Sequence, residues 1–166
     1  MNDSRFHESD LAALDPQAES SSEERARAIV ARLVERFPLA RDMLHHERAE
    51  IRHGALMRWL SEGSGMTLCE LSRSNPADVD LDLVPYAQGL RRLCVALRGD
   101  GDFRSIVLAD PFDADTRMWV ESRIRAAGHP STAWYVTSVA GVTAFYRRLE
   151  RETRALAAPP APEVPT

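Results

Sequence analysis

The sequence predicts an α+β fold in which an N-terminal helical hairpin is followed by a small sheet packed with helices. Three observations support this class. Apolar residues recur at helical spacing through residues 21–60, they alternate at strand spacing through 93–109, and helix and strand patterns then succeed each other up to residue 156. With 166 residues, of which 44% are hydrophobic, the chain is long enough to form one hydrophobic core with additional helices beside it.

The two ends of the chain differ in composition from the part between them. Residues 1–20 are polar and acidic, and we expect them to be disordered. Residues 157–166 contain four prolines, which exclude regular helix or strand, so we expect a disordered tail there.

Residues 21–62 are expected to form the helical hairpin. The Ser21-x-x-Glu24 pattern is a capping box, and the apolar stripe that follows it predicts a helix that ends before Pro38. Proline suits the first position of a helix, so we expect a second helix to run from Pro38 to about Leu60.

Residues 66–156 are expected to form a second unit, joined to the hairpin by the Gly/Ser-rich segment 61–65, which we predict to be a flexible hinge. A Gly-Asp turn between two apolar runs makes 92–109 a predicted β-hairpin. The expected elements are a short strand at 66–71, a loop at 74–82, a helix at 83–91, strands at 93–97 and 103–109, a helix at 114–127, a strand at 133–137 and a helix from 138 to 156. Ser138 is expected to cap this last helix.

Composition excludes several classes of activity. All 21 basic residues are arginine, so neither a Walker A loop nor a Schiff-base enzyme is possible. The net charge of −4 disfavours a nucleic-acid partner. No nucleophile elbow is present, and the single Glu50-x-x-His53 lacks the second copy that a di-iron bundle needs. We therefore expect no enzyme activity, no metal and no cofactor.

The sequence also bears on location. The first residues lack the basic and apolar regions of a signal peptide, and no apolar run approaches the roughly 18 residues of a membrane span. We expect a cytoplasmic protein without direct membrane insertion. Cys69 and Cys94 have no metal-site spacing and are expected to be reduced thiols.

A motif after the predicted hairpin resembles one from a known family. The run Leu108-Ala109-Asp110-Pro111-Phe112-Asp113 follows two strands, and Leu83-Val84-Pro85 precedes a short helix. In this respect residues 65–155 resemble the N-terminal domain of type II secretion and type IV pilus assembly ATPases, also called the MshEN domain. From their chemistry alone, Asp110 can cap a turn, Pro111 prevents further strand pairing, and Asp113 can cap the next helix. We expect a structural role for all three.

The resemblance implies a function, since in such ATPases this domain docks the motor to inner-membrane platform proteins. The sequence contains no motor, so we expect an adaptor or regulator of a membrane-bound secretion or polysaccharide-synthesis machine. The alternative is a cyclic di-GMP sensor, because some members of the family bind that nucleotide through arginine-leucine-glycine motifs. Here Arg32 and Arg58 occupy similar sequences that lack the glycine.

Six residues are predicted to contact the partner. The second helix has a broken apolar stripe, which leaves its end incompletely covered, so we expect it to expose Leu56, Trp59 and Leu60. On this view, truncating Trp59 costs less than about 1 kcal/mol of stability and about 2 kcal/mol or more of partner affinity. The alternative is that Trp59 belongs to the core, where truncation costs about 3–5 kcal/mol of stability. Phe112 is an aromatic anchor if exposed. Arg91 and Arg92, together with Arg98 and Arg104, are expected either to form a basic rim or to protect the edge of the hairpin from aggregation.

Overall fold

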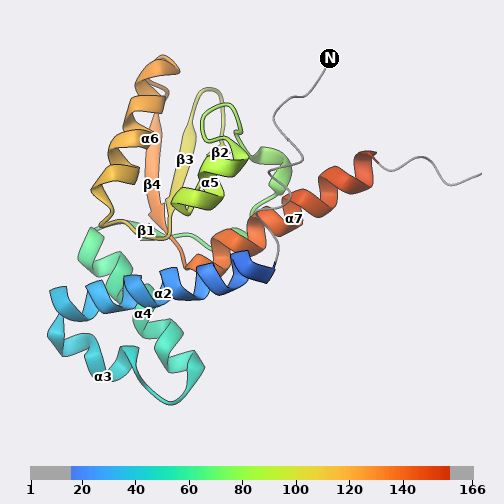
Figure 1. Cartoon of the computed structure of the whole chain (residues 1–166). Helices are drawn as coiled ribbons and strands as arrows, with labels where there is room; N and C mark the ends of the chain where they lie inside the picture. Colours follow the sequence, from blue (N-terminus) through green and yellow to red (C-terminus); the bar gives the residue numbers. More distant parts are fainter. Residues whose placement is uncertain (1–15, 158–166) are drawn as a thin grey trace, which may run out of the picture.

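The computed structural model describes residues 16–157, and this part of the chain has the predicted α+β fold (Figure 1). Residues 16–157 contain six helices, one mixed sheet of four strands and three 3-10 turns. The helices are α2 (Pro16–Arg36), α3 (Arg41–Leu44), α4 (Ala49–Ser64), α5 (Tyr86–Arg92), α6 (Ala114–Ala126) and α7 (Val139–Ala157). The strands are β1 (Thr67–Leu68), β2 (Cys94–Arg98), β3 (Arg104–Leu108) and β4 (Thr132–Val136), and the 3-10 turns are η2 (Pro38–Ala40), η3 (Leu71–Arg73) and η4 (Pro76–Asp78).

The sheet has the strand order β1-β4-β3-β2. The predicted β-hairpin is confirmed, because β2 and β3 pair antiparallel with Cys94 opposite Leu108. Strands β3, β4 and β1 run parallel, and α6 forms the crossover between β3 and β4. The outer edge of β2 is covered by the loop before α5, since the Asp80 N–H donates to the Ala96 carbonyl at 2.8 Å. That contact leaves β1 as the edge strand with exposed side chains.

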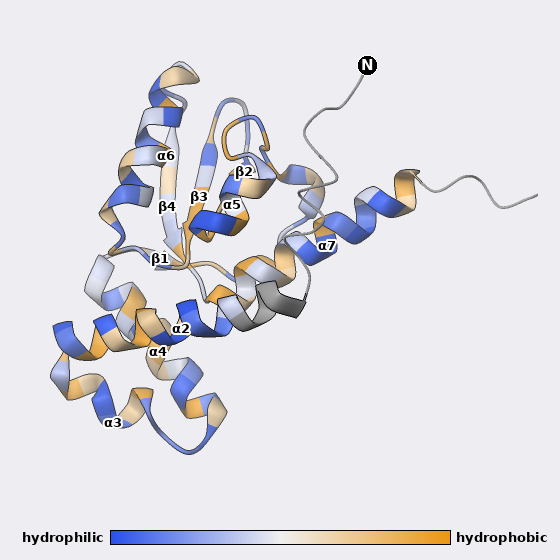
Figure 2. Ribbon diagram, in the orientation of Figure 1, coloured by the Kyte–Doolittle hydropathy of each residue, from blue (hydrophilic) through white to orange (hydrophobic). Residues whose placement is uncertain are grey.

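Helix α2 lies across the end of the sheet at which the arrow of β4 points (Figure 1). Arg32 of α2 forms an ion pair with Asp110, which follows β3, and α2 also packs against α7, which follows β4. Figure 2 shows the α3–α4 loop in hydrophilic colours, whereas the second half of β3 and the beginning of α7 are hydrophobic. Helix α2 therefore closes the end of the sheet where the parallel strands stop.

The helical region and the sheet share one hydrophobic core. Leu33 of α2 and Leu60 of α4 are as completely buried as Ile106 of β3 and Val120 of α6. The segment 61–65 differs from its prediction, because residues 61–64 form the last turn of α4 instead of a hinge. Gly65 ends the helix in the left-handed conformation, with φ of 72°, where glycine is the least strained residue.

The N-terminal helix begins earlier than predicted. Helix α2 starts at Pro16, so residues 16–20, expected to be disordered, are helical. The Ser21-x-x-Glu24 pattern lies inside the helix and is not its start. Proline is favourable at the first helical position, because the backbone N–H that it lacks would have no hydrogen-bond partner within the helix there. The other residues of the predicted disordered ends, 1–15 and 158–166, lie outside the described part.

The second helix of the hairpin is not continuous, which corrects the prediction of one helix from Pro38 to Leu60. The 3-10 turn η2 and the short α3 come first, and α4 starts only at Ala49. Arg52 stabilises the break, because its guanidinium donates to the carbonyls of His46 and Glu47 at 2.7 and 2.8 Å. These carbonyls are therefore satisfied without a continuous helix.

The predicted caps in the second half of the chain are confirmed. Asp113 accepts from the Thr116 N–H at the start of α6, at 3.3 Å, and Asp110 accepts from the Phe112 N–H at 3.2 Å. At the start of α7 the Ser138 hydroxyl accepts from the Gly141 N–H at 3.0 Å. Across residues 16–157, no helix has both the length and the apolar character that crossing a membrane requires.

Candidate functional site

Three half-buried aromatic side chains from different parts of the chain meet where the helical region joins the sheet. Phe37 directly follows α2, Trp59 lies on α4, and Phe112 belongs to the loop between β3 and α6. The rings of Phe37 and Trp59 are 5.1 Å apart between centroids. The Arg36 guanidinium lies 4.7 Å from the centroid of Phe112 and 5.8 Å from that of Phe37. We call these four residues the aromatic band.

Gly63 of α4 allows the band to assemble. A Cβ atom at this position would lie 2.7 Å from the Phe37 ring and 3.2 Å from the Phe112 ring, closer than such atoms pack. Glycine is unfavourable inside a helix by about 1 kcal/mol relative to alanine. Its presence in the last turn of α4 is therefore explained by the two rings that close over it.

The apolar surface continues past Trp59 into a small hollow. A cavity of about 280 Å³ is lined by Met43, Ile51, Gly54, Ala55, Arg58 and Trp59. Met43 is 49% exposed, and Leu39, one turn before it, is 92% exposed. An exposed apolar side chain that lines a hollow, as Met43 does, is typical of surfaces that bind other molecules.

The charges around the band come from arginines. Arg36 is exposed, and within the described residues it has no carboxylate partner, so the Phe112 and Phe37 rings are its neighbours. Arg58 lies 5.9 Å from the Trp59 ring and pairs with Glu62 at 3.1 Å. Arginine and tryptophan are the residues most enriched among binding hot spots, which gives the band the composition of a protein-binding anchor.

Asp110 fastens α2 beside the band through its ion pair with Arg32. Burial raises the pKa of the Asp110 carboxyl, and this effect outweighs the Arg32 charge and the hydrogen bond from the Phe112 N–H, which act in the opposite direction. The predicted structural role of the motif agrees with these contacts, because Asp110 turns the chain, Pro111 is buried and Asp113 caps α6.

The structure brings together two of the six predicted partner residues, Trp59 and Phe112. Leu56 is half-buried on the same helix as Trp59. The prediction of an exposed Leu60 is wrong, because this side chain is 1% exposed and belongs to the core. Helix α4 continues to Ser64 and packs against β1 and β4, so its last turns are covered by the sheet.

Arg91 and Arg92 contact a different region, at the end of α5. The Arg91 carbonyl accepts from Arg25 of α2, and its side chain is exposed. The Arg92 guanidinium lies 4.7 Å from the Trp119 ring and donates to Gln88 at 3.1 Å. Neither arginine contacts the aromatic band.

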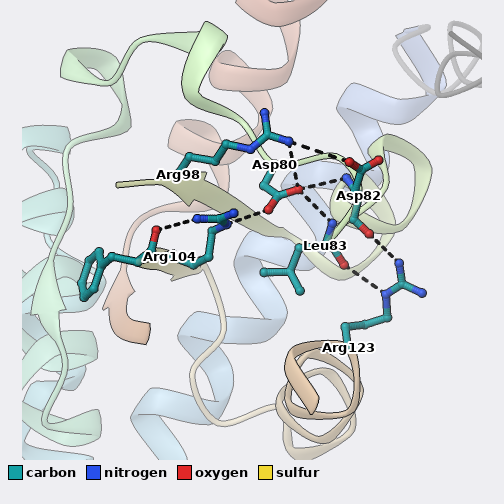
Figure 3. Close-up of polar contacts among 7 residues, drawn as sticks. Asp80, Asp82, Leu83, Arg98, Arg104 and Arg123 are labelled. Carbon is teal, nitrogen blue, oxygen red and sulfur yellow. Dashed lines mark hydrogen bonds and ion pairs between the residues drawn. The ribbon is translucent and has the colours of Figure 1, made fainter. Parts of the chain in front are cut away.

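Arg98 and Arg104 do not form the basic rim that was one of the two alternatives for them, because both are paired with carboxylates (Figure 3). Arg104 donates to Asp80 at 2.7 Å, and Arg98 lies 3.6 Å from the same carboxylate. Asp80 also accepts from the backbone N–H groups of Asp82 and Leu83, both at 3.1 Å. This buried aspartate joins the loop before α5 to the β-hairpin, which is a structural role.

No cluster of three or more histidine, cysteine, aspartate or glutamate side chains that could hold a metal ion is found in residues 16–157. Burial raises the pKa of the Cys94 thiol to about 12, so it stays protonated at neutral pH. Cys69 follows β1 and Cys94 begins β2, at opposite edges of the sheet, and both are free thiols.

Sequence reasoning missed Arg36, Phe37 and Gly63, the residues that connect Trp59 with Phe112. One signal was available for Gly63, because a glycine inside a helical pattern often marks a close approach of another element.

Comparison of the chain with protein-family models, with curated proteins and with solved structures finds no match. The resemblance of residues 65–155 to the secretion ATPase domain therefore stays a prediction.

Proposed function

We propose that this protein is a non-enzymatic interaction module that docks a protein partner on its aromatic band. The observation that carries the proposal is the meeting of Trp59, Phe37 and Phe112 at the surface, with the Arg36 guanidinium 4.7 Å from the Phe112 ring centroid. Half-exposed aromatic rings bury a large area at low entropic cost on binding. The exposed Met43, which lines the hollow together with Trp59, extends the apolar surface available to the partner.

The proposed partner is the cytoplasmic part of an inner-membrane secretion or glycan-synthase complex. This assignment comes from the resemblance of residues 65–155 to the N-terminal domain of secretion ATPases. The protein would act in the cytoplasm and reach the membrane through that partner. Its role would be to position or regulate the complex, as the resemblance implies.

Site-specific photo-cross-linking of the full chain in its own cells tests both parts of the proposal. We expect a photoreactive phenylalanine analogue at Met43 or Phe112 to capture the same protein, a subunit of a membrane-bound secretion or glycan-synthase complex. The same analogue at Met118, which is 65% exposed on α6, serves as the control. Equal capture from all three positions, or none from Met43 and Phe112, would reject docking on the band. Capture of an unrelated protein would reject only the assigned partner.

The alternative function, a cyclic di-GMP sensor, requires arginines that are free to hold phosphate. Arg32 is engaged by Asp110 and Arg58 by Glu62, so both would have to give up carboxylate partners. We expect calorimetric titration to show binding no tighter than about 100 μM. Micromolar binding that disappears in both Arg32→Ala and Arg58→Ala would replace the docking proposal with the sensor.

A further inference from the structure

A second surface lies on another side of the helical region, in an open groove between α2, α3 and α4. The groove has a volume of about 700 Å³, within the range of ligand-binding clefts. Its floor is apolar and is made by Val30 and Val34 of α2 and by the buried Leu44 of α3. Ala26 and Ala31 line it with small side chains that let another chain approach the α2 backbone closely.

The rim of this groove is positively charged, whereas the chain as a whole carries a net charge of −4. Arg27, Arg41 and Arg52 line it together with His45, and among the described residues of the lining Glu35 is the one carboxylate. Arg27 pairs with Glu23 only through an exposed contact of 3.5 Å, which gives little energy. Arg41 has no ion pair or hydrogen-bonded side-chain partner within the described residues.

We infer that this basic groove binds an acidic amphipathic helix of a protein partner. An apolar floor between charged rims is the geometry of helix-in-groove recognition, in which apolar residues at i, i+3 or i+4 and i+7 fill the groove. Carboxylates beside that apolar stripe would meet Arg27 and Arg41 at the rims. Such complementary charges decide which helices are accepted and speed their association.

The length of the groove agrees with a helix as occupant. Along α2 the lining residues extend from Ala26 to Glu35, a rise of roughly 14 Å at 1.5 Å per residue. A partner helix of about three turns covers that length and presents three or four apolar residues to the floor. The exposed Ala31 places no bulk in its path. This surface is separate from the aromatic band, so the inference stands independently of the proposed function.

A selection experiment with the full chain tests the inference. The probe is a displayed library of peptides of about 15 residues, with leucine fixed at helical spacing and the other positions randomised among Asp, Glu, Gln and Lys. We expect the retained peptides to be enriched in Asp and Glu. Arg41→Glu should weaken the binding of these peptides at least about tenfold by charge repulsion, and Ala31→Trp should weaken it as much by filling the groove. Arg125→Glu, the same change at an exposed arginine of α6, should leave binding unchanged.

Three results would overturn the inference: no enrichment, enrichment without an acidic bias, or acidic peptides that bind Arg41→Glu and Ala31→Trp as well as the wild type. A thermal melt of both variants excludes unfolding, which is not expected at two exposed positions.

Two further measurements test other occupants of the groove: sedimentation equilibrium of the protein alone, and calorimetric titration with decanoate. Self-association lost on Ala31→Trp would assign the groove to a second copy, and micromolar binding of decanoate would assign it to a small amphipathic carboxylate.

Discussion

Replacing Asp80 by alanine should be among the most damaging single changes in this protein. The Asp80 side chain is 8% exposed and accepts four interactions, from two backbone N–H groups and from the guanidinium groups of Arg98 and Arg104. Its removal leaves the largely buried Arg104 without its carboxylate and two loop N–H groups without an acceptor. Breaking a buried ion pair from one side costs about 3–5 kcal/mol, and we expect that loss in the free energy of unfolding.

Urea denaturation of the purified variant, followed by tryptophan fluorescence, measures this loss. Asp82→Ala is the matched control, because Asp82 lies 3.8 Å from the same Arg98 but its side chain is 74% exposed. The control should lose less than about 1 kcal/mol, as expected for a surface pair. A loss below about 1.5 kcal/mol for Asp80→Ala, or equal losses for both variants, would show that the buried network does not hold the loop.

The same network predicts a pH dependence. Burial acts to raise the pKa of Asp80, but the hydrogen bonds from Arg104 and Leu83 and the charges of Arg98 and Arg104 outweigh it, so the pKa lies below its usual value. A carboxyl with a depressed folded pKa stabilises the protein above its unfolded pKa of about 3.9 and loses this contribution as the pH falls. The stability difference between wild type and Asp80→Asn should therefore shrink from about pH 5 downward. A constant difference would contradict the assigned pKa direction.

Two further outcomes are expected from packing. Gly89→Ala should lower the free energy of unfolding by about 3 kcal/mol in a urea titration, since the new Cβ would lie 1.8 Å from the Tyr146 hydroxyl. Gly54→Ala, with nothing within 4 Å of the new Cβ, should raise it by up to about 1 kcal/mol. An unchanged stability for Gly89→Ala would refute the close contact. Native alkylation with iodoacetamide should modify the half-buried Cys69 before the buried Cys94, and a disulfide between them in the native protein would contradict the sheet order.

Local signals in the sequence predicted the second half of the fold well. The Gly-Asp turn between alternating apolar runs located the β2–β3 hairpin, and the side chains of Asp113 and Ser138 located the starts of α6 and α7. Each of these signals acts within a few residues. The parallel pairing of β3 with β4 and β1 has no such local marker and came from the structure.

The errors arose where distant residues decide the outcome. The break between α3 and α4 depends on Arg52, which binds carbonyls five and six residues before it, and periodicity does not report such a contact. Leu60 was predicted to be exposed because its stripe is interrupted, but the sheet covers the end of α4. The Ser21-x-x-Glu24 capping box predicted a helix start at Ser21, although Pro16 begins the helix.

The candidate site was predictable only in part, because Trp59 and Phe112 stood out as aromatic residues but their meeting did not. The contact of Trp59 with Phe37 also changes the expected effect of truncation. Replacing this half-buried tryptophan by alanine should cost the protein about 2 kcal/mol of stability, half of the cost at a fully buried site. The sequence alone led us to expect a cost of less than about 1 kcal/mol.

The binding affinity of the partner captured by cross-linking tests the central claim most directly. Isothermal titration should show that Arg36→Ala and Phe112→Ala each raise the Kd about 30-fold, the equivalent of 2 kcal/mol at a hot spot. Arg125→Ala should leave the Kd unchanged, and melts should show the band variants folded at the temperature of the titration. An unchanged Kd for both folded band variants would contradict docking on the aromatic band.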